Sequence, residues 1–456
     1  MSERSRKRII RIGETFGVIV LTGVCCMLLL FFSGLIPQSA IKEGCVESAK
    51  YFNEHDLFPY LIENQFNTRQ DNYSDCILVD IMYHISGEEV VESTVKASYY
   101  QPEMENVNTG LWESLQEDKE PNVDYSRYWH GTLAFLRPLF TITNIQGARI
   151  VFSTIWIALM LLNILLLWKQ RAKTLAVCYF AANIAMQAWV CATCIQYSTM
   201  FFMMNAVLTA VICFFHKRKD TEALYRKIGL LMAVSGVCTC FFDFLTAETL
   251  PLTVPLIILW ILRYEAGELT EWKNELKYLI SCVSIWGTGY ALMFVFKWIL
   301  VAAFSGREAL LLALSSAGER FVGKVHMGNT SLDPLATSSQ RFFGAIFRNQ
   351  GMLFPYKSDM SDAAGFASFF AVFFICAFCI YMFRGKNYSG KMLGLCALLS
   401  AIPYIRFIVL QNHAFMHYFF TYRAQMVTVI ALLYCTWEFG LGNILGKKKQ
   451  GAKRRR

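Results

Sequence analysis

Charged residues are scarce in this chain. Only 17% of its 456 residues are charged, whereas 55% are hydrophobic, and this balance excludes an ordinary soluble domain. The sequence also lacks Walker, G-x-G-x-x-G, G-x-S-x-G and kinase motifs, so we expect no nucleotide chemistry in the cytoplasm. It has no internal repeat, which an inverted-repeat transporter would show.

Long apolar stretches are what the sequence has in abundance. A helix needs about 20 apolar residues to cross the hydrocarbon core of a bilayer. Ten stretches approach that length, at 15–36, 148–168, 174–192, 197–215, 228–246, 249–263, 278–304, 364–383, 392–410 and 424–441. The sixth is short and contains Pro251 and Pro255, which predicts a kinked or re-entrant helix. The sequence therefore predicts an all-α integral membrane protein with about ten transmembrane helices.

The spacing of these stretches divides the chain into seven segments. They are a basic N-terminus (1–14), a first transmembrane helix (15–36), an extracytoplasmic loop with juxtamembrane helices (37–147), a core transmembrane bundle (148–304), a second extracytoplasmic loop (305–363), C-terminal transmembrane helices (364–441) and a basic tail (442–456). Lysines and arginines gather in alternate connections, which predicts that both termini are cytoplasmic. We attribute the net charge of +9 to this topology and to contact with anionic membrane lipid, with no role in binding nucleic acid.

The large loop between the first two helices contains a pair of aspartates in the motif Asp71-Asn72-Tyr73-Ser74-Asp75. On a helix, Asp71 and Asp75 share one face, where their charges repel unless a cation or a proton is shared. The pair could therefore hold a divalent metal ion, or could provide a general base. The alternative is structural: Asp71 caps a helix and Asp75 lies in its first turn.

A second motif near the end of this loop combines aromatic and basic residues. It contains Arg127, Tyr128, Trp129 and His130, immediately before an apolar run. Tyrosine and tryptophan favour the membrane interface for their amphipathic character alone. Arginine binds phosphate through paired hydrogen bonds, and the motif therefore also suits a phosphate-linked, sugar-bearing lipid.

Further polar candidates lie in or beside predicted transmembrane helices. They are Gln196, Arg406, Asn412, His413, His417 and Arg423, with Lys297, Asp243 and Glu248 as weaker cases. His413 and His417 are four residues apart and could share a ligand, although their motif is not the H-E-x-x-H zinc pattern. A charge inside a span usually faces the bundle or a cavity. The alternatives are an interfacial polar belt and, for Gln196, hydrogen bonds within its own turn.

Together these features resemble the GT-C superfamily of membrane glycosyltransferases. The likeness lies in the cytoplasmic N-terminus, the long first loop with an acidic residue and the helical bundle that follows. The motifs Asp71-x-Tyr73-x-Asp75 and Arg127-Tyr128-Trp129-His130-Gly131 are also similar to uncharacterised membrane proteins of Gram-positive bacteria. The resemblance implies a GT-C-like fold in a bacterial plasma membrane. In many such enzymes an acidic pair closely follows the first helix, where this chain has only Glu43 and Glu47.

The resemblance leads to a hypothesis about function. It implies inverting transfer of a sugar from a polyprenyl-phosphate donor to a cell-envelope acceptor on the extracytoplasmic face. Asp71 or Asp75 would then be the base, while Arg127 and His130, with Arg423, would hold the phosphate. The alternatives are a transporter or flippase of a lipid-linked or anionic solute, and a non-catalytic protein of envelope-polysaccharide assembly.

Overall fold

The computed structural model describes residues 3–103, 105–321, 323–326, 334–354, 362–385 and 387–442. Across these ranges the secondary structure is almost entirely helical, which confirms the all-α class. The strands β1 (Ser98–Tyr99) and β2 (Val123–Asp124) form one small antiparallel pair. The basic tail beyond residue 442 and parts of the second loop lie outside the described residues.

Eight helices in the described part of the chain are long and apolar enough to cross a membrane, which confirms a multi-pass membrane protein. They are α1 (Glu3–Gly34), α7 (Ile145–Lys169), α10 (Ile195–His216), α11 (Thr221–Phe242), α13 (Trp272–Gly318), α15 (Asp362–Phe383), α16 (Gly390–Val409) and the run Tyr418–Leu441. That last run comprises α18 (Tyr418–Thr421), η2 (Tyr422–Gln425), α19 (Met426–Thr436) and η3 (Trp437–Leu441).

The other two predicted spans correspond to shorter helices. The stretch 174–192 is divided into α8 (Lys173–Ala185) and α9 (Ala188–Ala192), because Gln187 adopts a left-handed conformation with φ 49°. The stretch 249–263 is α12 (Leu250–Glu265), whose residues from Leu250 to Arg263 are all buried. Pro251 lies in the first turn, where its missing N–H costs no helical hydrogen bond, whereas Pro255 lies inside the helix. This helix is a core element of the bundle.

The long loop after α1 folds into a helical lobe, which we call the α2–α6 lobe. Its helices are α2 (Gln38–Asn53), η1 (Phe66–Thr68), α3 (Asn72–His84), α4 (Val90–Lys96), α5 (Val107–Glu117) and α6 (Leu133–Leu139). The buried guanidinium of Arg137 donates to the carbonyl oxygens of Ile36, Met82 and Ile85. Because these carbonyls end α1 and α3, Arg137 fixes α6 against both helices.

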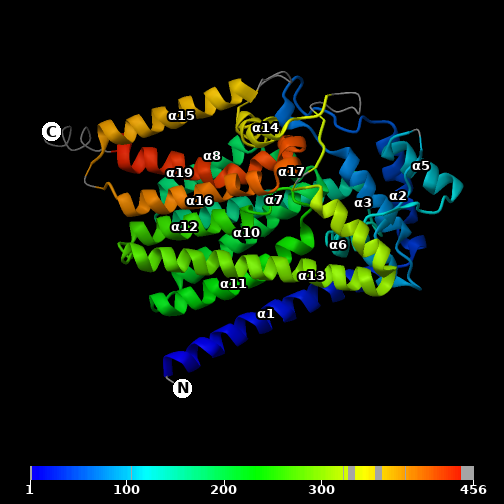
Figure 1. Cartoon of the computed structure of the whole chain (residues 1–456), viewed down its shortest axis with the longest axis horizontal. Helices are drawn as coiled ribbons and strands as arrows, with labels where there is room; N and C mark the ends of the chain where they lie inside the picture. Colours follow the sequence, from blue (N-terminus) through cyan, green and yellow to red (C-terminus); the bar gives the residue numbers. More distant parts are fainter. Residues whose placement is uncertain are drawn as a thin grey trace.

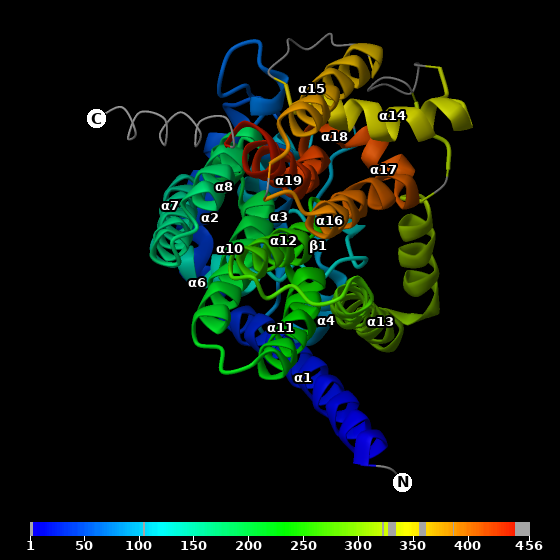
Figure 2. The same ribbon diagram turned by 90° about the vertical axis from the view of Figure 1, so that its left-hand side faces the viewer.

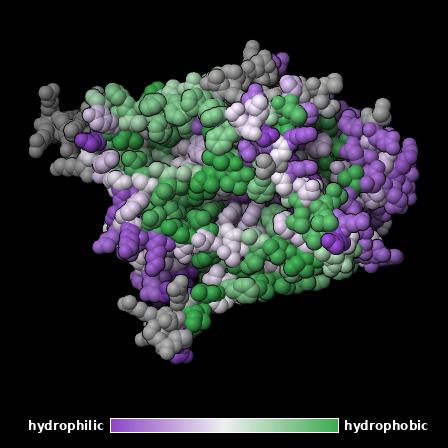
Figure 3. Space-filling model, in the orientation of Figure 1, coloured by the Kyte–Doolittle hydropathy of each residue, from purple (hydrophilic) through white to green (hydrophobic). Residues whose placement is uncertain are grey.

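The membrane helices pack side by side, with the α2–α6 lobe at one end of the bundle (Figures 1 and 2). α11 and α13 approach closely, since a Cβ at Gly236 would lie 2.1 Å from the carbonyl oxygen of Trp286. In Figure 3 a hydrophobic band separates the polar lobe at the right from a second polar region at the lower left. α1 begins at this second end, opposite the lobe (Figure 1).

Two short helices complete the lobe end of the bundle. They are α14 (Ser338–Gly351) and α17 (Gln411–Met416), and they pack against one another. α13 is interrupted at Gly306, whose φ of 83° and ψ of 177° are not helical. The chain therefore changes direction there before residues 307–318 continue as a helix, which ends next to α17.

Candidate functional site

Asp75, predicted as a base or metal ligand, is instead part of a structural ion pair. Its carboxylate is fully buried and accepts hydrogen bonds from Arg149, at 2.8 Å to Nη2 and 3.1 Å to Nε. The backbone N–H groups of Ile195 and Gln196 also donate to it. Burial raises the pKa of Asp75, and the positive charge of Arg149 opposes that rise. With its oxygens occupied, Asp75 is not free to take a proton from an acceptor.

Asp71 caps α3, as the structural alternative predicted. Its carboxylate accepts from the backbone N–H and hydroxyl of Ser74 and from the hydroxyl of Tyr197. Burial raises the pKa of Asp71, although these hydrogen bonds favour the charged form. The described residues contain no group of three or more His, Cys, Asp or Glu that could hold a metal ion. The carboxylate oxygens of Asp71 and Asp75 are thus engaged by other groups of the protein.

Two other candidates, Trp129 and His130, are held inside the protein by hydrogen bonds to its backbone. The indole N–H of Trp129 donates to the carbonyl oxygen of Met293 at 2.9 Å, and Trp129 is 1% exposed. The imidazole Nε2 of His130 lies 3.0 Å from the carbonyl oxygen of Tyr125, and burial lowers the pKa of His130 to about 3. The predicted role of these side chains in binding substrate is therefore replaced by packing of the lobe against the bundle.

Arg423 and Gln196 also have structural partners. Arg423 is buried and donates to the carbonyl oxygens of Met186, Phe419 and Asn67. The side-chain amide of Gln196 donates to the carbonyl oxygen of Ser74 at 2.8 Å. Both residues therefore connect separate parts of the chain.

The remaining candidates do come together, at the lobe end of the bundle. Arg406, near the end of α16, donates to Glu248 at 2.8 Å and to the carbonyl oxygen of Leu245, and its Nη2 lies 3.3 Å from Nδ1 of His413. His413 and His417 both belong to the α17 region, and their ring centroids are 4.7 Å apart. The two imidazoles are therefore adjacent, as their spacing of four residues led us to expect.

The end of α13 joins this group and adds Arg320. The side-chain amide of Asn412 donates to the carbonyl oxygen of Glu319 at 2.8 Å. The backbone N–H of His413 donates to the carbonyl oxygen of Arg320 at 3.3 Å. Arg127 enters from the lobe, with its guanidinium 4.2 Å from the ring centre of Tyr125 and 5.4 Å from that of Tyr128. We call the group of Arg127, Arg320, Arg406, His413 and His417 the Arg–His cluster.

Positive charge in the Arg–His cluster exceeds what nearby carboxylates offset. Burial lowers the pKa of His417 to about 3, and the charges of Arg320, Arg406 and Arg127 act in the same direction. Burial and then His417 lower the pKa of His413, again aided by these arginines. Both imidazoles are therefore neutral at pH 7. Glu248 pairs with Arg406, but no carboxylate among the described residues forms an ion pair with Arg127 or Arg320.

Several donors in the cluster have no hydrogen-bond partner among the described residues. They are Nε of Arg127, Nε of Arg320 and Nη1 of Arg406, all of them buried atoms. Buried donors usually find a partner, because leaving one unpaired costs about 1–3 kcal/mol. Guanidinium groups with free donors are suited to a phosphate or carboxylate.

A carboxylate beside the cluster has the properties of a general base. Asp243 follows α11 and is 3% exposed; its Oδ1 accepts from Thr246, whereas its Oδ2 has no hydrogen-bond partner in the described part of the chain. Burial and the nearby charge of Glu248 raise the pKa of Asp243 to about 7. The next residue, Phe244, packs against Tyr128 with ring centroids 5.5 Å apart, which connects Asp243 to the loop that carries Arg127.

Two residues of this region were not predicted in this role from the sequence. Arg320 was not named as a candidate, and Asp243 was named only as a weaker intramembrane charge. A signal was present for Asp243, since a carboxylate next to the end of a span must be paired or functional. Comparison with known proteins finds no matching family model, curated protein or solved structure.

Proposed function

We propose that this chain is an integral membrane glycosyltransferase that uses a polyprenyl-phosphate sugar as donor at the Arg–His cluster. The observation that carries the proposal is the pair Arg127 and Arg320, which face neutral imidazoles without carboxylate partners among the described residues. Two guanidinium groups in a partly dry site bind a phosphate strongly and selectively. The acceptor would be a hydroxyl of the cell envelope, on the extracytoplasmic face of a bacterial plasma membrane.

Asp243 replaces Asp71 and Asp75 as the proposed base. The acceptor oxygen attacks the anomeric carbon, its proton passes to Oδ2 of Asp243, and the bond from that carbon to the phosphate oxygen breaks. The electron pair of that bond leaves with the polyprenyl phosphate, whose charge Arg127 and Arg320 offset. A base with a pKa of about 7 is half deprotonated at neutral pH, which suits this role.

The same contacts weigh against the transporter alternative. That alternative requires Lys297 and Arg406 as counter-charges facing a passage. The ammonium of Lys297 instead donates to the carbonyl oxygen of Val95 at 2.7 Å, and Arg406 pairs with Glu248. Both charges are used to join helices, so the transferase is the function we propose.

Binding of a short-chain polyprenyl phosphate to the full chain in nanodiscs tests the proposal. Removing one guanidinium should weaken binding about 10- to 100-fold, because a hydrogen bond to a charged group contributes about 1.5–3 kcal/mol. We expect this loss in Arg127→Gln and in Arg320→Gln. Arg307→Gln is the matched control, since Arg307 lies exposed earlier on the same segment.

The uncharged polyprenol provides the control for the lipid chain. It should bind weakly and equally to all four proteins, because it lacks the phosphate. Equal affinity of wild type for polyprenol and polyprenyl phosphate, or unchanged affinity in both cluster variants, would reject the Arg–His cluster as a phosphate site.

A further inference from the structure

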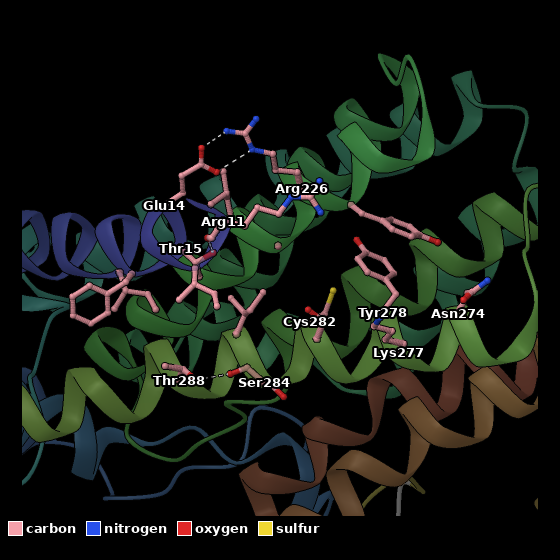
Figure 4. A pocket seen from close by; sticks show the side chains of 18 of the residues that line it. Arg11, Glu14, Thr15, Arg226, Asn274, Lys277, Tyr278, Cys282, Ser284 and Thr288 are labelled. Atoms are coloured by element: carbon pink, nitrogen blue, oxygen red, sulfur yellow. Dashed lines mark hydrogen bonds and ion pairs between the residues drawn. The ribbon is translucent and has the colours of Figure 1, made fainter. Parts of the chain in front are cut away.

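A cavity lies at the end of the bundle opposite the α2–α6 lobe. It has a volume of about 770 Å³ and is lined by residues of α1, α11 and α13 (Figure 4). The residues that line it lie near the beginning of each of these three helices. The cavity is thus distant in sequence and in space from the Arg–His cluster, and no step of the proposed reaction uses it.

The cavity has apolar walls and a polar mouth. Phe16, Ile19, Leu230 and Ile285 are among the residues of its walls. Its polar residues include Arg11, Glu14, Arg226, Asn274 and Lys277, which lie nearer the starts of the helices. A hydrophobic groove with a polar rim at the end of a membrane helix fits a lipid, whose chains are apolar and whose headgroup is polar.

Tyr278 provides an unpartnered donor inside the cavity. Its side chain rises from α13 into the space beneath Arg226 in the view of Figure 4. Tyr278 is 8% exposed, and its hydroxyl has no oxygen or nitrogen partner among the described residues; the thiol of Cys282 lies beside it. Its ring is held in place by Tyr225, which stacks on it at 3.6 Å. A buried tyrosine hydroxyl normally finds a partner.

The charges at the mouth leave one lysine uncompensated. Arg11 pairs with Glu222 and Arg226 pairs with Glu14, so these four side chains balance one another. Lys277 forms no ion pair with any carboxylate of the described chain and lies one residue from Tyr278. The mouth therefore has a net positive charge next to the Tyr278 hydroxyl, which has no oxygen or nitrogen partner among the described residues, and this favours an anionic group.

We propose that this cavity binds one anionic glycerophospholipid. Its acyl chains lie against the apolar walls between α1 and α13, while its phosphate accepts a hydrogen bond from Tyr278 and faces Lys277. Such a lipid would fill the space between α1 and the rest of the bundle and would hold α1 in its observed position. Phosphatidylglycerol is a suitable probe, with zwitterionic phosphatidylcholine as its neutral counterpart.

Native mass spectrometry of the full chain with equimolar dioleoyl phosphatidylglycerol and dioleoyl phosphatidylcholine tests this site. Wild type should retain the first phosphatidylglycerol about fivefold in preference to phosphatidylcholine, as expected for one basic residue near a lipid surface. Lys277→Gln should abolish that preference. Lys273→Gln, one turn earlier on the same helix and outside the cavity, should keep it.

A steric variant tests the walls independently of charge. Ser281 lines the cavity, so Ser281→Trp should fill it and remove the retained lipid of both kinds. Ile299→Trp, on an exposed part of the same helix outside the cavity, should retain lipid as wild type does. Thermal unfolding of each variant confirms that it is folded.

The proposal is overturned if wild type shows no preference between the two lipids. It is also overturned if Lys273→Gln loses the preference as fully as Lys277→Gln, or if Ser281→Trp retains lipid as wild type does. These outcomes do not depend on polyprenyl phosphate, so they separate the lipid site from the proposed transferase site.

Discussion

The carboxylate of Asp75 on α3 is bound by the guanidinium of Arg149 on α7, 74 residues later in the chain. The backbone of α10 completes the contact through Ile195 and Gln196. One buried ion pair therefore connects the α2–α6 lobe to two helices of the bundle. Such a pair is costly to break from one side, because the partner is left as an unpaired buried charge.

Asp75→Asn should accordingly destabilise the protein. We expect a loss of about 3–5 kcal/mol, the usual effect of removing one member of a buried pair. Thermal unfolding in detergent measures this as a lower midpoint, with Glu43→Gln on the exposed face of α2 as the control. If Asp75→Asn kept the stability of wild type but lost sugar transfer, Asp75 would have a catalytic role and not a structural one.

Asp243→Asn should abolish turnover and leave binding of polyprenyl phosphate within about twofold of wild type. The amide has nearly the shape of the carboxylate but cannot accept the proton of the acceptor. Release of polyprenyl phosphate from a sugar-loaded donor measures the first effect, and ligand binding measures the second. Turnover close to that of wild type would exclude Asp243 as the base.

The raised pKa of Asp243 also predicts how turnover depends on pH. The base must be deprotonated, so the rate should rise with pH through about 7 and then become constant. The stability of the protein should change in the opposite sense. The pKa of Asp243 in the folded protein lies above its unfolded value of 3.8. The contribution of Asp243 to the free energy of unfolding is therefore complete below about pH 4 and is lost as pH rises through about 7.

The difference between wild type and Asp243→Asn isolates this contribution. The variant has no group that titrates at this position, so its unfolding midpoint should fall less than that of wild type between pH 5 and about 8. Parallel midpoints for the two proteins over this range would show that Asp243 titrates at its ordinary pKa.

The sequence predicted the helices well because hydropathy is a local property. The expected end of the seventh span at residue 304 lies two residues before Gly306, where α13 is interrupted. The third predicted span, 174–192, is not one continuous helix, because Gln187 adopts a left-handed conformation that divides it. Nothing in its apolar pattern indicated that conformation. Backbone conformation of this kind depends on how neighbouring segments pack.

The candidate site was harder to predict because its residues come from distant parts of the chain. Asp71 and Asp75 have the right spacing for chemistry, but their roles depend on Tyr197 and Arg149, which no local pattern relates to them. His413 and His417 are closer to a local pattern, since their spacing of four residues alone brings the two rings together. Arg320 could be assigned only after α17 was found packed against the end of α13.

The neutral imidazoles of the Arg–His cluster predict a loss of stability in mild acid. The pKa of His417 in the folded protein lies below its ordinary value of 6.5. The stabilising contribution of the neutral imidazole is therefore complete above pH 6.5 and is lost as pH falls toward about 3. His417→Asn should reduce the fall of the unfolding midpoint between about pH 7 and 5. His55→Asn, on an exposed part of the lobe, is the control and should behave as wild type.

Gly306 determines the direction of the segment that positions Arg320. Its φ of 83° and ψ of 177° fall in a region that is almost exclusive to glycine, although a Cβ there would meet no atom within 4 Å. Gly306→Ala should therefore lower the free energy of unfolding by about 1–3 kcal/mol through backbone strain alone, and should weaken polyprenyl phosphate binding as Arg320 is displaced.

Gly287→Ala is the matched control, because Gly287 lies within the same helix and also has open space around it. Alanine is the better helix former, so this control should be neutral or slightly stabilising by thermal unfolding. Equal stability and equal phosphate affinity in the two variants would mean that the break at Gly306 does not place Arg320.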